Sequence, residues 1–208
     1  SMQCGLSHAL GIATRELVPG DIVLLEAGLE CELVLASTKT HKLADGTDYY
    51  TINSKGSVPL LELDNGERLS EGPVIVQYLA DLAPASKLAP ANGTMARYRL
   101  QEWLNFLTSE VHKGFSPLFN PATPEDFKPV AKARLADQLA WVDSRLEGKS
   151  YLMGDQFTVA DPYLFVLTSW TQPTGIDISK LTHLGAFMAR VVARPAVQQA
   201  MKEEGLLK

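Results

Sequence analysis

The amino-acid sequence predicts an α/β domain at residues 1–82, a linker at residues 83–92 and an all-helical domain at residues 93–208. Before the linker, helical and strand patterns follow one another, as they do in α/β folds. The linker contains Pro84 and Pro90 among small and polar residues, and proline ends helices. Beyond it, apolar residues recur at a spacing of about 3.6, which is the period of an α-helix.

The composition is that of a soluble globular protein. A chain of 208 residues with 46% hydrophobic content is long enough to bury a core. A net charge of −5, without any run of lysines and arginines, argues against nucleic acid as a partner. No apolar run approaches about 18 residues and no secretion-signal pattern is present, so we expect a cytoplasmic protein without a membrane partner. Cys4 and Cys31 form neither a disulfide framework nor a metal-ligand spacing, and we expect no metal.

The first elements are predicted only from residue 21 onward, because glycines and a proline interrupt every period in residues 3–20. Asp21 is expected to cap a helix over residues 22–27, and Gly28 to end it. Residues 31–35 then alternate in the manner of a strand.

A β-hairpin is predicted at residues 60–69. Pro59 precedes the short apolar strand 60–63, and proline is tolerated at the first position or the edge of a strand. The sequence Asp64-Asn65-Gly66 is a strong hairpin signal and returns the chain through residues 67–69. This arrangement leaves the backbone of Val58 free to face a ligand, and we expect the Val58–Pro59 peptide bond to be cis.

Ser70 is predicted to be the N-cap of the next helix, with Glu71, Gly72 and Pro73 in the first turn. Free N–H groups and the positive end of the helix dipole would then lie beside the Glu71 carboxylate. Such a helix end suits a ligand that carries both a carboxylate and an ammonium group. On its own, Glu71 could equally serve only the helix dipole.

The second domain is predicted to be built from amphipathic helices. A helix that starts at Thr123-Pro124 is expected to run to Gly148. Thr158 and Asp161 form a variant capping box before an apolar helix, which we expect at the centre of the domain. Two more helices are expected, at residues 184–193 and from Pro195 onward. The first helix of the domain is expected to present an apolar face made of Met95, Tyr98, Trp103, Phe106, Leu107 and Val111.

One stripe of this first helix is polar. Asn105, Ser109 and His112 lie at positions i, i+4 and i+7, so an amide, a hydroxyl and an imidazole share one face. The spacing alone favours a polar face in contact with water.

Several motifs resemble the bacterial beta class of glutathione transferases. The resemblance is carried by residues 71–81, 103–106 and 110–115, and it continues from about residue 21 to the C-terminus. It implies a thioredoxin-like first domain with an early strand near residues 3–10, and glutathione as co-substrate, held between the two domains. It also implies a homodimer that serves detoxification by conjugating glutathione to a small hydrophobic electrophile.

The resemblance further implies a set of site residues. Glu71 and Gly72 match the pair that holds the γ-glutamyl group of glutathione, and Asn105 and His112 match residues that border its sulfur and backbone. His41 stands where the family often has a lysine near the glycine carboxylate. The full set implied for glutathione binding is Val58, Pro59, Glu71, Gly72, Asn105, Ser109, His112 and His41.

The N-terminal segment departs from the family pattern. Beta-class enzymes carry a Pro-Gly-Ala-Cys-Ser-like stretch after the first strand, whereas residues 7–14 of this chain contain no cysteine. Ser7 and Thr14 are candidate hydroxyl donors to a thiolate, with His112 as the third catalytic candidate. Two hypotheses therefore stand: a glutathione transferase with weakened activity, or a catalytically impaired glutathione-binding or interaction protein of the same fold.

Overall fold

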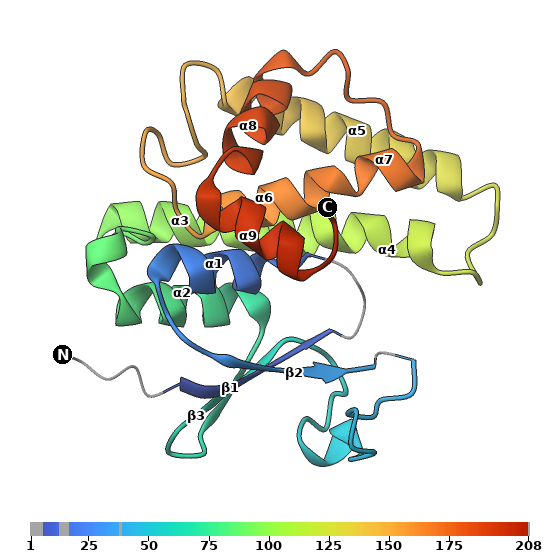
Figure 1. Cartoon of the computed structure of the whole chain (residues 1–208). Helices are drawn as coiled ribbons and strands as arrows, with labels where there is room; N and C mark the ends of the chain where they lie inside the picture. Colours follow the sequence, from blue (N-terminus) through green and yellow to red (C-terminus); the bar gives the residue numbers. More distant parts are fainter. Residues whose placement is uncertain (1–5, 13–16, 38, 208) are drawn as a thin grey trace. The chain divides into compact units, whose positions relative to one another are not determined.

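The computed structural model describes residues 6–12, 17–37 and 39–207. The contacts within the chain define two compact units (Figure 1). The first unit spans residues 1–86 and 196–208, and the second spans residues 87–195. The C-terminal segment thus groups with the first unit, unlike in the expected division, and the boundaries at residues 82 and 93 remain a prediction.

The first unit is a four-stranded sheet with helices packed on it. Strand β1 pairs in parallel with β2 and antiparallel with β3, and β3 pairs antiparallel with β4, which gives the order β2-β1-β3-β4. Helices α1 and α2 pack against each other on one side of this sheet (Figure 1). The elements are β1 Leu6–Ile12, α1 Pro19–Ala27, β2 Glu32–Ala36, η1 Tyr49–Thr51, β3 Leu60–Leu63, β4 Arg68–Ser70, α2 Gly72–Leu82 and η2 Pro84–Ser86.

The predicted hairpin is confirmed, and a small core cluster packs against the residues at its start. The tight turn closes through a hydrogen bond from the Leu63 amide to the Glu67 carbonyl (2.8 Å), with Gly66 at φ 84°. Partly buried Val58 packs against a cluster of Ala36, Tyr49 and Leu60. The Val58–Pro59 bond is cis, as predicted.

Two predicted helix starts in this unit are wrong. Helix α1 begins at Pro19 after the N-cap Val18, because proline is well suited to the first turn, and Asp21 lies inside that turn. Ser70 pairs with Leu60 as the last residue of β4, so the N-cap position of α2 falls to Glu71. A proline at the start of the helix thus displaced the first predicted cap, and strand pairing displaced the second.

Burial changes the acidity of Asp21. Loss of water raises the pKa of this carboxyl from 3.8 to about 7, and Glu204 and Glu203 beside it add to the rise, whereas a backbone hydrogen bond with Val18 opposes it. The folded protein therefore holds this proton more tightly than the unfolded chain between about pH 4 and pH 7. Its stability falls as the pH rises through that window.

We expect Asp21→Asn to remove part of this fall. In urea titrations, the free energy of unfolding should exceed that of the parent protein by about 1 kcal/mol or more at pH 8, and should be little changed at pH 4. Asp177→Asn is the control, because Asp177 is an exposed carboxylate whose pKa is lowered by hydrogen bonds from Ser179. An equal gain at both pH values, or the same gain in the control, would contradict this explanation.

The second unit is helical. Helix α6 is buried along residues 160–168 and packs against both α3 and α8, which confirms its predicted central place. Segments α3, η3 and α4 follow one another without a break, and η3 is π-helical. The helices are α3 Met95–Phe106, η3 Leu107–His112, α4 Lys113–Phe119, α5 Lys128–Arg145, α6 Ala160–Ser169, α7 Thr171–Thr174 and α8 Thr182–Val192, followed by α9 Pro195–Glu203, most of which belongs to the first unit.

Two predictions about these helices are wrong. Leu107 and Val111 of the predicted apolar face are buried as expected, but Met95 and Tyr98 are 68% and 57% exposed, because α3 buries its neighbouring face through Leu100 and Leu104. Helix α5 begins at Lys128 rather than near Pro124, since Pro129 takes the first-turn position and residues 124–127 form a separate turn.

Half of the predicted capping box is present. Asp161 is fully buried and accepts a hydrogen bond from the Thr158 amide (2.8 Å), as predicted, and a second one from the Leu152 amide (2.9 Å). The Thr158 hydroxyl was expected to cap the helix, but it is buried and has no hydrogen-bond partner among the described residues. The amide that this hydroxyl was expected to cover, that of Asp161, instead donates to the Thr158 carbonyl at 3.1 Å.

Candidate functional site

A rigid loop presents Val58 in the first unit. The Tyr49 hydroxyl and the Asn53 side-chain amide both donate hydrogen bonds to the Ser57 carbonyl, at 2.8 and 2.7 Å. Gly56 lies at φ 64°, and a Cβ atom there would collide with the ring of Tyr50. Val58 comes directly after this loop, and its backbone makes no hydrogen bond to any residue in the described part of the chain. It can therefore pair with an extended ligand.

Glu71 lies beside this loop at the start of α2. It adopts φ 70° and ψ 111°, a backbone conformation that is rare for a residue other than glycine and that is found preferentially at functional sites. Its carboxylate is 2.6 Å from the Lys55 ammonium, which also donates to the Ser70 hydroxyl at 3.2 Å. The side chain of Glu71 is 65% exposed, so a ligand can reach it.

Gly72 completes this end of α2. The amides of Val74 and Ile75 bond to the Glu71 carbonyl, and Pro73 has no N–H group. Within the described residues, the Gly72 amide is thus left for a ligand at the positive end of the helix dipole. A donor and a carboxylate stand next to each other, which is the combination predicted for a ligand with a carboxylate and an ammonium group.

In the part of the chain that the structure describes, His41 makes its contacts with Tyr50, Ser37 and Tyr49 rather than with Val58 or Glu71. Its ring packs edge-on against Tyr50, with 4.6 Å between ring centroids, and its Nδ1 atom is buried with no hydrogen-bond partner among the described residues. Its backbone bonds to Ser37 and Tyr49. No hydrogen bond or ring contact joins His41 to Val58 or Glu71 in the described part of the chain.

The second unit exposes Asn105, Ser109 and His112 on one continuous helical segment. Ser109 and His112 lie in η3, and π-helical turns are frequent at functional sites. The Ser109 hydroxyl donates to the Asn105 carbonyl at 2.7 Å, so it is used within its own helix. The amide of Asn105 and the imidazole of His112 are therefore the groups better suited to a ligand.

His112 is held by an aromatic cluster that sequence reasoning missed. Its ring packs edge-on against Trp170, at 5.1 Å between centroids, and Trp170 also contacts Phe115 and Phe119. Although His112 remains partly exposed, partial loss of water around its imidazole lowers the pKa of His112, and the positive charge of Lys113 lowers it further. His112 is thus kept neutral near pH 7, with one N–H group to donate. No local pattern points to Trp170, which follows α6 far along the chain.

The remaining residues of interest are Ser7, Thr14 and the two cysteines. Thr14 and Cys4 lie outside the described residues. Ser7 falls in β1, where the structure describes the strand but not its side chains, and the pairing of β1 with β3 changes register between Leu6 and His8. Cys31 is partly buried just before β2.

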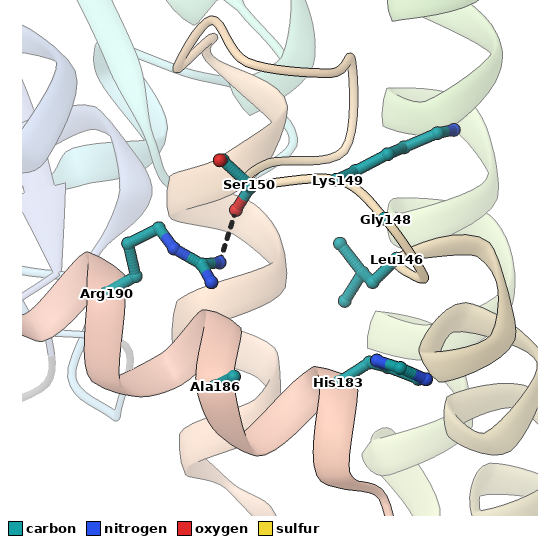
Figure 2. Close-up of a pocket in the computed structure, with 7 residues that line it drawn as sticks. All are labelled: Leu146, Gly148, Lys149, Ser150, His183, Ala186 and Arg190. Atoms are coloured by element: carbon teal, nitrogen blue, oxygen red, sulfur yellow. Dashed lines mark hydrogen bonds between the residues drawn. The ribbon is translucent and has the colours of Figure 1, made fainter.

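Two surface hollows in the helical unit are lined by other residues. Arg190 donates a hydrogen bond to the Ser150 carbonyl (2.6 Å) in the first, and Lys149 points away from Arg190 (Figure 2). This hollow, of about 320 Å³, is lined by Leu146, Gly148, Lys149, Ser150, His183, Ala186 and Arg190. The second, of about 660 Å³, is lined by Arg99, Glu102, Trp103, Phe106, Trp141, Arg145, Lys149, Leu152 and Met153. Neither set includes a residue predicted to bind or activate glutathione.

The structure also bears on metals and membranes. Across the described residues, no three histidine, cysteine, aspartate or glutamate side chains gather closely enough to hold a metal ion. None of the helices in that part of the chain is both long and apolar enough to cross a membrane.

Comparison with known proteins gives consistent matches along the chain. The family model "Glutathione S-transferase, N-terminal domain" matches residues 20–81, and "Glutathione S-transferase, C-terminal domain" matches residues 106–195. Glutathione S-transferase GstA of Escherichia coli O157:H7 is 42% identical over 185 residues, which cover 89% of this chain and 92% of the relative. Glutathione S-transferase GST-4.5 of Xanthomonas campestris is 34% identical over 192 residues, with the same two shares.

Solved structures agree with these matches. The bacterial glutathione transferase BphK, solved as a ternary complex, has a TM-score of 0.90 and 47% identity and covers 94% of this chain and 99% of its own. A sphingomonad glutathione S-transferase complexed with glutathione has a TM-score of 0.90 and 41% identity, with shares of 96% and 100%. The beta-class enzyme of Sphingomonas chungbukensis has a TM-score of 0.90 and 40% identity, with shares of 95% and 100%.

Proposed function

This chain belongs to the glutathione S-transferase family, and on that premise we propose that it conjugates the thiolate of glutathione to small hydrophobic electrophiles. The observation that carries the proposal is the junction of β4 and α2. There the Glu71 carboxylate and the Gly72 amide stand together beside the loop that presents Val58. These groups complement an ammonium, a carboxylate and an extended peptide backbone, all of which glutathione has.

We assign the binding roles residue by residue. Glu71 binds the ammonium of the γ-glutamyl group, and the Gly72 amide with the end of α2 binds its carboxylate. The backbone of Val58, which directly precedes Pro59, pairs with the central part of the tripeptide. Asn105 and His112 contribute donors near the thiol. Ser109 and His41 have secondary roles, since the Ser109 hydroxyl bonds within its own helix and the His41 ring packs against Tyr50.

The chemical step needs a thiolate and a leaving group. Hydrogen-bond donors such as the neutral His112, together with Ser7 or Thr14, favour the thiolate and so lower the pKa of the glutathione thiol, whose proton passes to solvent. The sulfur then forms a bond to the electrophilic carbon, and the leaving group departs with its bonding pair. No cysteine of the protein takes part in this sequence.

The test combines binding and turnover in the parent protein and in Cys4→Ala/Cys31→Ala. We expect calorimetry to show glutathione binding and spectrophotometry to show conjugation of chlorodinitrobenzene, with both properties retained in the double variant, because bound glutathione supplies the only nucleophile. Binding without turnover would instead identify a glutathione-binding protein. Loss of turnover in a folded double variant would show that a protein thiol is used.

We further propose that the protein works as a homodimer in the cytoplasm, in detoxification, as is typical of this family. Light scattering coupled to size-exclusion chromatography tests the first point. A mass of one chain across the working concentration range would contradict it.

A further inference from the structure

Lys55 links the two parts of the proposed glutathione-binding surface. It lies on the loop that presents Val58, and its ammonium reaches the junction of β4 and α2, at 2.6 Å from Oε1 of Glu71 and 3.2 Å from the Ser70 hydroxyl. An ammonium has three hydrogens, so one remains for a further acceptor. Oε2 of Glu71 has no partner among the described residues. Each member of the ion pair thus keeps capacity for one more partner.

The position of Lys55 is set by its loop. Its backbone amide donates to Oδ1 of Asn53 at 3.1 Å, and the same Asn53 side chain donates to the Ser57 carbonyl. The Tyr49 hydroxyl holds that carbonyl as well. The lysine therefore starts from a fixed backbone, while its side chain and that of Glu71 are 52% and 65% exposed and accessible to a ligand.

An α-amino acid head group has the charges that complement this pair. It carries an ammonium and a carboxylate on one carbon, and the pair offers a carboxylate and an ammonium side by side. Docking of the head group creates a ring of four alternating charges, in which each charge has two opposite neighbours. Charge-assisted hydrogen bonds of this kind are stronger than neutral ones. The Gly72 amide adds a neutral donor to the same carboxylate of the ligand.

Resting on the proposed function, we propose that Lys55 binds the α-carboxylate of the γ-glutamyl group while Glu71 binds its ammonium. The Lys55–Glu71 pair then selects thiols that carry a complete amino acid head group. Lys55 does not touch the reacting atoms, so it determines affinity and specificity rather than the rate of the chemical step.

The ion pair has little role in folding. Exposed pairs contribute little to stability, because water and ions screen them. A Lys55→Met variant should therefore unfold at the same urea concentration as the parent protein, and a change in glutathione binding can be assigned to the lost ammonium.

The test uses glutathione and two analogues, one without the α-carboxylate and one without the α-ammonium. We expect Lys55→Met to bind glutathione roughly 10- to 150-fold more weakly, the range of a lost charge-assisted hydrogen bond, and to raise KM for glutathione without changing kcat. It should bind the analogue without the α-carboxylate as well as the parent protein does. Lys55→Arg should retain most of the glutathione affinity. Lys42 is an exposed lysine on the same unit, and Lys42→Met should leave the glutathione affinity unchanged.

The possible results distinguish direct binding of the ligand by Lys55 from an indirect effect through Glu71 and from failure of the proposed function. Equal losses for glutathione and for the analogue without the α-carboxylate would overturn the proposal, because Lys55 would then act only through Glu71. Unchanged or tighter binding of glutathione to Lys55→Met would also overturn it, since Lys55 would then be idle or a competitor of the ligand ammonium. If the parent protein itself binds no glutathione, the proposed function fails, and that result is seen before any variant is compared.

Discussion

Glutathione should bind Glu71→Ala roughly 10- to 150-fold more weakly than the parent protein, since a hydrogen bond between charged groups contributes about 1.5 to 3 kcal/mol. The loss follows from the geometry at the start of α2, where the Glu71 carboxylate has one oxygen on Lys55 and the other open. Calorimetry with glutathione measures it directly. Glu71→Gln, which keeps the shape but not the charge, should lose most of the same affinity.

A matched control comes from the hairpin. Glu67 is an exposed glutamate whose carboxylate accepts a hydrogen bond from Asn65, and Glu67→Ala removes the same charge from the same unit. It should leave glutathione affinity unchanged. If Glu71→Ala binds as tightly as the parent protein and is folded, Glu71 serves only the dipole of α2. If both variants lose affinity equally, net charge rather than position explains the effect.

Asp161→Ala should lower the free energy of unfolding by about 2 to 6 kcal/mol at pH 6, because it strands two buried amides at about 1 to 3 kcal/mol each. Those amides belong to Leu152 and Thr158, and Asp161 is 0% exposed. Urea titration measures the loss. Asp161→Asn keeps one acceptor oxygen, so it should lose less than the alanine variant.

Thr158→Val is the matched control for this prediction. The change removes a buried hydroxyl that has no partner among the described residues and keeps the shape of the side chain. It should shift stability by less than about 1 kcal/mol, since no hydrogen bond is lost. A large loss in Thr158→Val with a small one in Asp161→Ala would show that the hydroxyl caps α6 after all.

Asp161 also contributes to the dependence of stability on pH. Burial raises its pKa from 3.8 to about 7, against the lowering effect of its two amide partners and of Arg194. Like Asp21, it holds its proton more tightly in the folded state, so it adds to the fall in stability between about pH 4 and pH 7. The fall that remains in Asp21→Asn should therefore be reduced again when Asp161→Asn is added.

The sequence by itself determined the local elements around the proposed site. The strand Leu60–Leu63 and the turn at Gly66 both follow from constraints within a few residues, namely turn chemistry and the geometry of proline. The apolar run of α6 likewise predicted a buried central helix. Family motifs added the identity of the ligand, which no periodicity reveals.

Only the tertiary structure decided which group meets which. Lys55 reaches Glu71 across 16 residues of sequence, and Trp170 packs on His112 from the turn between α6 and α7; no local pattern encodes either contact. The same holds for the face that α3 buries, where Met95 and Tyr98 were expected inside and lie outside. Helical spacing defines the faces of a helix, but packing against α6 selects the one that is buried, because the free energy of burial depends on the partner that removes the water.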